Sequence, residues 1–251
     1  MDGSSIERVA DLVRKARHIA VLSGAGISTA SGIPDFRSAS GLYSDDRNTN
    51  VFDLGEFHRN PEHFYRFARE FYPKVIAAQP NGAHLALARW EKAGRHVEIA
   101  TQNVDDFHQR AGSQHVYPVH GSFVTSTCVE CSAACRTSAI AGVIARGELP
   151  RCACGGVFKP DITFFGELLP VAAWESSVRA MSSADLVLVL GTSLVVYPAA
   201  SLPEYRRSDA GLVVINHDTT ALDSAADVAI HDDLPGVMEA ITARLGFCFQ
   251  V

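Results

Sequence analysis

The sequence predicts an α/β fold in which a parallel β-sheet, covered by helices, carries a smaller helical and zinc-binding lobe. Three observations favour this fold: continuously apolar runs typical of buried parallel strands, helical patterns between them, and one interrupting segment that concentrates cysteines. The 251 residues, 47% of them hydrophobic and 20% charged, are enough for a substantial core and are unlike a disordered chain.

The charge balance argues against nucleic acid or an acidic membrane as a partner. The chain has 22 Lys and Arg against 28 Asp and Glu, so its net charge is -6. The longest apolar stretch, residues 186–200, is interrupted by polar residues and falls short of the ~20 residues that cross a bilayer. The first residues lack the basic-then-apolar order of a secretion signal, so we expect a cytoplasmic protein.

Three helices can be placed from their start signals. Ser4 and Glu7 predict a capping box at the start of the first helix, whose apolar residues recur at helical spacing. Asn60 followed by Pro61 predicts the N-cap and first turn of a second helix with a buried aromatic face. A third helix is expected from about residue 81 to residue 94.

Four apolar runs predict buried parallel strands, and each run ends in small, polar residues. The runs are residues 18–22, 96–100, 185–190 and 212–215. They are followed by Ser23-Gly24-Ala25-Gly26, Thr101-Gln102-Asn103, Gly191-Thr192-Ser193 and Asn216. Because ligands bind beyond the carboxyl ends of an open parallel sheet, these segments predict one rim of a Rossmann-like domain and a ligand about as large as a dinucleotide.

The glycine loop after the first strand matches a dinucleotide fingerprint only in part. Gly24 and Gly26 satisfy its first half, but Thr29 stands where a third glycine is usual. A tight strand-to-helix turn is the alternative interpretation. As a phosphate site, the loop would donate from the N–H groups of Ile27, Ser28 and Thr29. No acidic residue ends a second strand to bind the ribose, which argues against an ordinary hydride-transferring dehydrogenase.

The cysteine spacing predicts a structural zinc site. Cys128 and Cys131 form a CxxC pair, and Cys152 and Cys154 form a CxC pair. Four thiolates give zinc closed tetrahedral coordination with no position for a catalytic water, and the metal would replace the core that this small segment lacks. Cys135 could replace a member of the set.

Two interruptions of the alternating pattern predict the domain organisation. We expect a larger domain formed by residues 1–37, 76–121 and 157–251 and a small lobe formed by residues 38–75 and 122–156. His120 lies at the boundary between them, where clefts form. Most histidines are surface or core residues, so position alone does not make His120 catalytic.

A set of motifs, taken in order, resembles the sirtuin family over essentially the whole chain. The motifs are Gly24-Ala25-Gly26-Ile27-Ser28, Gly32-Ile33-Pro34-Asp35-Phe36-Arg37, Thr101-Gln102-Asn103-Val104-Asp105, His120-Gly121, the two cysteine pairs, residues 159–167, residues 191–198 and Asn216. The resemblance implies an NAD-dependent protein lysine deacetylase that releases nicotinamide and O-acetyl-ADP-ribose.

The resemblance also implies which residues serve NAD. His120 would be the general base on the ribose hydroxyls, Asn103 would position the ribose and a water, and Asp105 would hold the nicotinamide carboxamide. The full expected NAD set is Gly24, Ala25, Gly26, Thr29, Asp35, Phe36, Arg37, Gln102, Asn103, Val104, Asp105, His120, Gly191, Thr192, Ser193 and Asn216.

The same resemblance implies an acetylated peptide or protein as substrate, bound as an added strand. Its binding segments would be Phe165, Gly166 and Glu167 on one side and Val195, Val196 and Tyr197 on the other. Relatives that prefer acidic acyl groups carry Tyr-x-x-Arg, whereas here Tyr65 precedes Arg69 by four residues, which argues against a carboxylate clamp. We expect a monomer.

Two alternatives differ in chemistry. The first is a mono-ADP-ribosyltransferase on the same fold, which replacement of His120 would favour; the histidine is present. The second is a non-catalytic zinc module that binds protein or nucleic acid. Too few basic residues surround the cysteines for a convincing phosphate footprint, which argues against the second.

Overall fold

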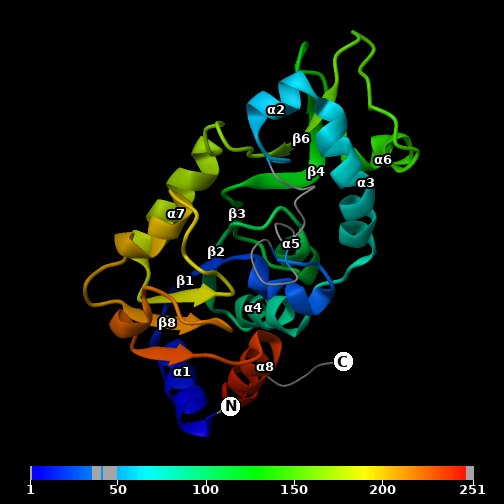
Figure 1. Cartoon of the computed structure of the whole chain (residues 1–251). Helices are drawn as coiled ribbons and strands as arrows, with labels where there is room; N and C mark the ends of the chain where they lie inside the picture. Colours follow the sequence, from blue (N-terminus) through cyan, green and yellow to red (C-terminus); the bar gives the residue numbers. More distant parts are fainter. Residues whose placement is uncertain (1, 36–40, 42–49, 247–251) are drawn as a thin grey trace.

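A six-stranded parallel sheet organises the larger part of the molecule. The computed structural model describes residues 2–35, 41 and 50–246. The strand order is β3-β2-β1-β7-β8-β9, and every neighbouring pair is parallel (Figure 1). The strands are β1 (His18–Ser23), β2 (His96–Thr101), β3 (Val116–Pro118), β7 (Leu186–Leu190), β8 (Gly211–Ile215) and β9 (Val228–Ile230).

The four predicted strands are confirmed, and they form the middle of the sheet. The outer strands β3 and β9 were not predicted, because each has only three residues and carries little periodicity. Strand order reverses between β1 and β7, which is the position where open α/β sheets bind their ligands.

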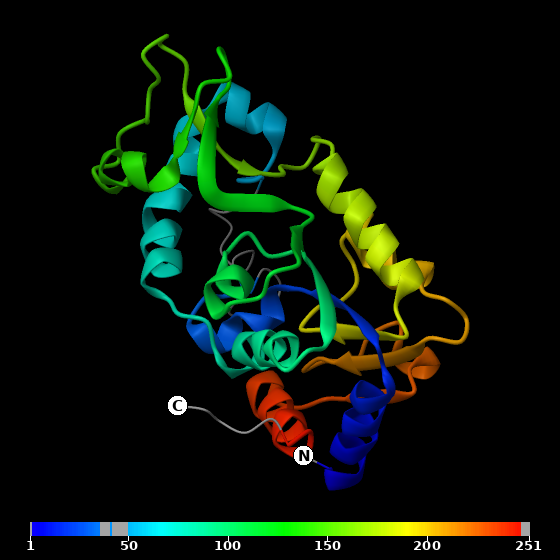
Figure 2. The ribbon, with the colours of Figure 1, turned by 180° about the vertical axis from the view of Figure 1, so that it is seen from behind.

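Helices cover both faces of this sheet. One face packs against α1 (Gly3–Lys15), α4 (Gly82–Lys92) and α8 (Leu234–Arg244). The other packs against α7 (Val171–Ser183) and the 3-10 segment η5 (Ala199–Tyr205). Figure 2 shows the first and last helices, α1 and α8, side by side. No helix in the described part of the chain is both long enough and apolar enough to span a bilayer.

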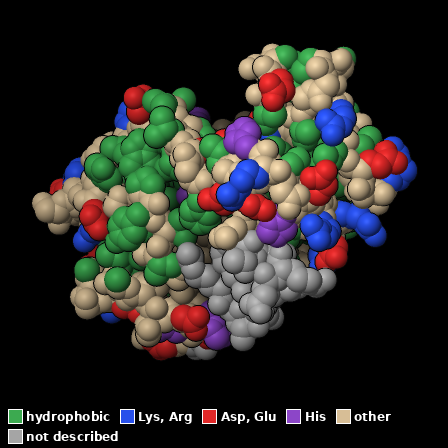
Figure 3. Space-filling model, turned by 45° about the horizontal axis from the view of Figure 1, so that its top comes forward, with side chains coloured by type: hydrophobic (Ala, Val, Ile, Leu, Met, Phe, Trp, Pro, Cys, Tyr) green, Lys and Arg blue, Asp and Glu red, His purple; other side chains and the backbone are tan. Residues whose placement is uncertain are grey.

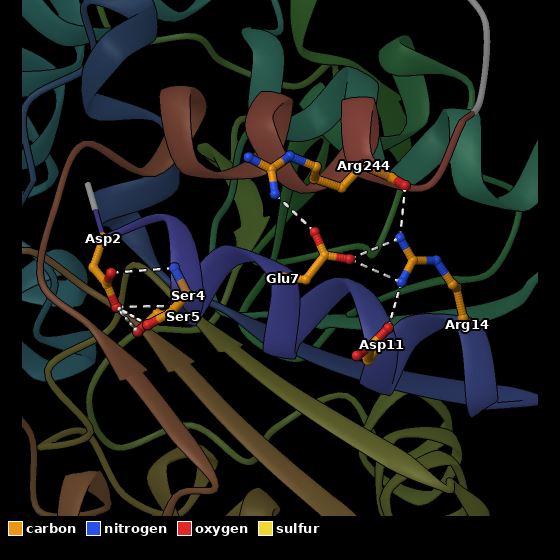
Figure 4. A network of polar contacts seen from close by, with 7 residues as sticks. All are labelled: Asp2, Ser4, Ser5, Glu7, Asp11, Arg14 and Arg244. Carbon is orange, nitrogen blue, oxygen red and sulfur yellow. Dashed lines mark hydrogen bonds and ion pairs between the residues drawn. The ribbon is translucent and has the colours of Figure 1, made fainter.

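The start of α1 differs from the predicted capping box. Asp2 is the N-cap, and its carboxylate accepts a hydrogen bond from the backbone N–H of Ser4 at 3.1 Å (Figure 4). Glu7 instead accepts from Arg14 at 3.2 Å and from Arg244 of α8 at 2.7 Å. The prediction was wrong because a charged acceptor stands two residues before Ser4, which moves Ser4 into the first turn.

The other two predicted helix starts are confirmed. The helix α3 (Pro61–Ala77) begins after Asn60, although the Asn60 side chain makes no capping hydrogen bond. Asn81 caps α4 by accepting from the N–H of Ala83 at 3.0 Å.

A second, antiparallel sheet lies beside the large one. Its strand order is β5-β4-β6, formed by β4 (Gly121–Cys128), β5 (Ala134–Arg136) and β6 (Phe158–Ile162). The helices α2 (Leu54–Arg59), α3 and α6 (Thr137–Ala145) belong to the same region, whereas α5 (Phe107–Ala111) packs against α4 beside the large sheet (Figure 1). A separate core with the aromatic rings of Phe57, Phe64, Phe71, Phe123 and Phe164 holds it together. Strand β6 of this sheet lies in residues 157–251, which the sequence analysis assigned to the larger domain. The domain boundaries remain a prediction.

Candidate active site

The ends of β1 and β7 meet so closely that only glycine fits. The N–H of Gly24 donates to the carbonyl of Leu190 at 3.0 Å, and that of Gly26 to the carbonyl of Gly191 at 2.8 Å. A Cβ on Gly26 would lie 2.9 Å from Cα of Gly191, which itself has φ +61°. The glycines are therefore needed for this contact at the switch point of the sheet, whatever they bind.

The turn that follows is closed on itself. Within η1 (Ala25–Ile27), the N–H of Ile27 donates to Gly24 at 3.1 Å and the N–H of Ser28 donates to Ala25 at 3.0 Å. The expectation that these two N–H groups are open to a phosphate is wrong, because a 3-10 turn pairs each with a carbonyl three residues earlier. The exposed Thr29 donates its hydroxyl to the carbonyl of Gly26 at 3.0 Å.

Three buried polar side chains are hydrogen-bonded in series at the carboxyl-terminal edge of the large sheet. Asn103 donates from Nδ2 to Oγ of Ser28 at 3.1 Å, and Ser28 donates to Oδ2 of Asp105 at 2.8 Å. The N–H of Phe107 donates to the other Asp105 oxygen at 3.1 Å. Burial raises the pKa of Asp105, although both of these hydrogen bonds oppose the rise.

The side chain of Ser28 connects two predicted site residues, although the sequence analysis assigned a role only to the backbone N–H of Ser28. Its side chain is 1% exposed, and it is the only link between Asn103 and Asp105 in the hydrogen bonds of the described residues. A serine directly after a glycine turn was the available sequence signal, but that signal does not say where the hydroxyl points.

His120 is held by the end of β2. Its Nδ1 lies 3.0 Å from the carbonyl oxygen of Gln102, and its own carbonyl accepts from the N–H of Thr163 at 2.8 Å. Because a carbonyl can only accept, Nδ1 carries the proton and Nε2 keeps its lone pair. Burial lowers the pKa of His120 against the opposing effect of the Gln102 carbonyl, so the ring is neutral at pH 7.

The remaining rim residues connect the strand ends. Gln102 donates from Nε2 to Oγ1 of Thr192 at 3.0 Å, which ties β2 to β7. At the end of β8, Asn216 donates from Nδ2 to the carbonyl of Asp218 at 2.8 Å. The carbonyl of Val104 accepts from Phe123 in β4 at 3.0 Å.

The predicted peptide segments differ in how their backbones are used. The N–H of Phe165 donates to the carbonyl of Phe52 at 2.7 Å, and the carbonyl of Phe165 accepts from the N–H of Leu54 at 3.1 Å. The backbone of Phe165 is therefore already paired with residues 52–54. The Glu167 carboxylate accepts from the N–H of Phe164 at 2.7 Å and pairs with Lys159 at 3.0 Å.

Apolar side chains are nevertheless exposed in both segments. Phe165 is 57% exposed, Val195 54% and Tyr197 70%. Figure 3 shows hydrophobic side chains gathered on the side of the molecule where α7 lies. Exposed apolar groups in this number are typical of a surface that meets a partner.

Four cysteine sulfurs form one cluster, as predicted. Sγ of Cys128 lies 3.5 Å from Sγ of Cys154, and Sγ of Cys131 lies 3.6 Å from Sγ of Cys152. All four atoms lie within 4.8 Å of one another. Thiolates around a tetrahedral zinc ion lie about 3.8 Å apart, so the separations fit this ion. Cys135 is outside the cluster, and Cys248 lies outside the described residues.

The surroundings of the cysteines also fit zinc. A Cβ on Gly156 would lie 2.8 Å from Sγ of Cys128, so the second knuckle closes around the sulfur only with glycine there. The backbone N–H of Cys131 lowers the pKa of Cys128 to about 7. The neighbouring thiols raise the pKa of Cys154 to about 12 despite the N–H of Gly156, because one thiolate disfavours another. A divalent cation removes that repulsion.

Comparison with known proteins decides the family. The model of the Sir2 family matches residues 24–198, which include the glycine loop, His120, the cysteines and the end of β7. This chain belongs to the Sir2 family. The sirtuin resemblance is thereby confirmed.

Three Sir2 relatives cover nearly the whole chain. An NAD-dependent protein deacetylase of Thermotoga maritima is 42% identical over 89% of this chain and 92% of its own. A Sir2 structure with a deacetylated p53 peptide and 3′-O-acetyl ADP ribose is 38% identical, has a TM-score of 0.90 and covers 96% of this chain and 98% of its own. A Sir2 structure with a p53 peptide and NAD is 39% identical, with a TM-score of 0.89, and covers 97% of this chain and 99% of its own.

Within this Sir2 fold, the structure brings most of the predicted site residues to one edge of the large sheet. Those from the ends of β1, β2 and β7 are joined by hydrogen bonds through Ser28 and Thr192. Phe36 and Arg37 lie outside the described residues, directly after Asp35.

Proposed function

We propose that this Sir2 chain removes acetyl groups from protein lysines with NAD as co-substrate, releasing nicotinamide and O-acetyl-ADP-ribose. The observation that carries the proposal is that the hydrogen-bonded residues Asn103, Ser28 and Asp105 and the neutral His120 ring lie at the same carboxyl-terminal edge of the large sheet. The deacetylase name of the Thermotoga relative and the acetylated ADP ribose in a similar structure support it.

We assign NAD to the rim formed by the strand ends. When bound, NAD supplies a cationic nicotinamide leaving group and hence an electrophilic ribose carbon. Asp105 would accept from the carboxamide, since each of its oxygens has one protein donor and a carboxylate oxygen can accept more. The full assignment is Gly24, Ala25, Gly26, Thr29, Asp35, Phe36, Arg37, Gln102, Asn103, Val104, Asp105, His120, Gly191, Thr192, Ser193 and Asn216.

His120 would act as the general base. Its Nδ1–H is held by the Gln102 carbonyl, which turns the basic Nε2 away from that contact. The lowered pKa keeps the ring neutral, so Nε2 can take a proton from a ribose hydroxyl at neutral pH. Asn103 would position the ribose and a water, with its amide oriented by Ser28.

The acyl group would be acetyl rather than an acidic acyl group. Tyr65 is 3% exposed and its hydroxyl donates to the carbonyl of Phe158, so it is not free to bind a substrate carboxylate. The peptide would bind between Phe165, Gly166 and Glu167 on one side and Val195, Val196 and Tyr197 on the other. The exposed apolar side chains of both segments support this placement.

Zinc would be structural and held by Cys128, Cys131, Cys152 and Cys154. With four thiolate ligands it has no open position, so it takes no part in the reaction. We also propose that the protein is cytoplasmic and monomeric and binds no nucleic acid; the net charge of -6 supports the last point.

One assay tests the function against mono-ADP-ribosyl transfer. The protein is incubated with NAD and matched peptides that differ only in lysine acetylation, and the products are separated by mass. We expect nicotinamide and O-acetyl-ADP-ribose only with the acetylated peptide. His115→Ala, at the other edge of the sheet, is the control variant and should keep this activity. ADP-ribose attached to a protein acceptor, without loss of acetyl groups, would show that the alternative is right.

A further inference from the structure

Three side chains that can bind metal meet at the edge of the large sheet opposite to the strand ends. His18 begins β1 and His96 begins β2, and the two residues are register partners in adjacent parallel strands. Glu98 follows His96 by two residues, so both side chains stand on the same face of β2. At about 3.3 Å per residue, His18 lies about 16 Å along β1 from the rim at Ser23.

The distances among these side chains approach those of a metal site. Oε2 of Glu98 lies 2.7 Å from Nε2 of His18 and 3.3 Å from Nε2 of His96. The three ligand atoms lie within 4.8 Å of one another. Ligand atoms around a tetrahedral zinc ion lie about 3.4 Å apart. The His96–Glu98 pair already has this spacing, and the His18–Glu98 pair needs to open by about 0.7 Å.

The nitrogen of His18 is held against the carboxylate without hydrogen-bonding to it. Nε2 of His18 is buried and has no hydrogen-bond partner among the described residues, although Oε2 of Glu98 is only 2.7 Å away. The two groups therefore form an ion pair that lacks the geometry of a hydrogen bond. In a metal site the lone pairs of the ligands aim at the ion rather than at one another, which accounts for this arrangement.

A residue outside the cluster also orients its carboxylate. Tyr117 of β3 donates its hydroxyl to the other oxygen of Glu98, which orients the carboxylate towards the histidines. Hydrogen bonds of this kind to a ligating carboxylate are typical of metal sites. His18 and Glu98 are 15% and 17% exposed, whereas His96 is 53% exposed, so an ion can enter from the His96 side.

We propose that His18, His96 and Glu98 form a second zinc site, separate from the four cysteines. Two imidazole nitrogens and a carboxylate are a donor set that zinc uses, with water completing the coordination. An ion here would link the first residues of two neighbouring strands and so stabilise the sheet. Because it lies at the opposite edge from the rim, it would not compete with a ligand there.

The test uses the full chain with its cysteine site already loaded with zinc. Zinc is titrated into this protein by calorimetry, and bound zinc per chain is measured after equilibrium dialysis. His96→Ala removes an exposed ligand and so leaves the fold intact. His115→Ala is the matched control, because its ring centroid lies 5.6 Å from that of His96 but it is outside the ligand set.

We expect the parent protein and His115→Ala to bind one zinc ion beyond the cysteine site and to show a higher melting temperature with it. His96→Ala should bind this ion at least about 100-fold more weakly, since losing even an outer partner of a ligand costs about 10- to 100-fold. The proposal is overturned if the parent protein takes up no zinc beyond the cysteine site. Equal affinity in His96→Ala, or loss of binding in His115→Ala, overturns the three-residue ligand set in the same way.

Discussion

Replacing Ser28 by alanine isolates the residue that joins Asn103 to Asp105. The Ser28 hydroxyl donates to Asp105 at 2.8 Å and accepts from Asn103 at 3.1 Å. A hydrogen bond to a charged group contributes about 1.5–3 kcal/mol, so its loss should raise the pKa of Asp105 by about one to two units. Burial already raises that pKa, so Asp105 in the variant would protonate closer to neutral pH.

The assay is the pH dependence of kcat/KM for NAD in the deacetylation reaction. Protonated Asp105 has lost an acceptor for the nicotinamide carboxamide, so activity should fail on the acid side. In Ser28→Ala this acid limb should move up by about one to two pH units. The free energy of unfolding should fall by about 2–4 kcal/mol, because Asn103 also loses its acceptor.

Ser113→Ala is the matched control for this substitution. Ser28 is 1% exposed and Ser113 is 5% exposed, but Oγ of Ser113 has no hydrogen-bond partner in the described part of the chain. Removing that oxygen should leave both activity and stability nearly unchanged. If Ser28→Ala and Ser113→Ala had the same pH profile, the reasoning that Ser28 tunes Asp105 would be refuted.

Three further predictions concern the base, the metal and a buried histidine. His120→Ala should lower deacetylation about 10²- to 10⁴-fold while equilibrium binding of NAD is retained, and undiminished turnover would contradict its role as a base. Stripping zinc with a chelator should unfold the cysteine-containing region, detected by proteolysis between β4 and β6; an unchanged digestion pattern would argue against a structural metal. Burial lowers the pKa of His84 to about 4 from 6.5. The unfolded chain therefore binds a proton that the native state rejects, and stability falls as pH drops from 6.5 towards 4. His84→Asn keeps an acceptor for the N–H of Asn81 and should remove about 2 kcal/mol of the loss between pH 7 and pH 5, measured by denaturant unfolding at both values. Identical losses in parent and variant would show that His84 is not the group responsible.

The sequence predicted the central strands because burial on both faces leaves a plain signal. The runs at β1, β7 and β8 are largely apolar, as strands between two helix layers have to be, whereas β2 also contains His96, Glu98 and Thr101. The short outer strands and the antiparallel sheet carry no such signal. The outer strands form by pairing with β2 and β8, and the antiparallel sheet forms by packing on the aromatic core. These contacts join residues that are far apart in the sequence.

The glycine loop shows how a correct motif can have a different physical cause. The sequence left a phosphate site and a tight turn open as interpretations of its glycines, and in the structure these glycines allow the backbone of Gly191 to approach. The N–H groups of Ile27 and Ser28, expected to face a ligand, are paired within the turn. A local pattern identifies the residues that need to be small but does not identify the neighbour that requires it.

Sequence by itself determined which chemical groups this protein has and roughly where they lie along the chain: four paired cysteines, a histidine between two regions, and polar residues after buried strands. Local spacing is enough for that, because knuckles, caps and strand periods are short-range. Only the tertiary structure decided that Ser28 bridges Asn103 and Asp105, that Gln102 sets the tautomer of His120, and that His18 meets His96 and Glu98. Those contacts join residues 18 to 80 positions apart, and folding of the sheet is what brings them within hydrogen-bond or metal-ligand distance.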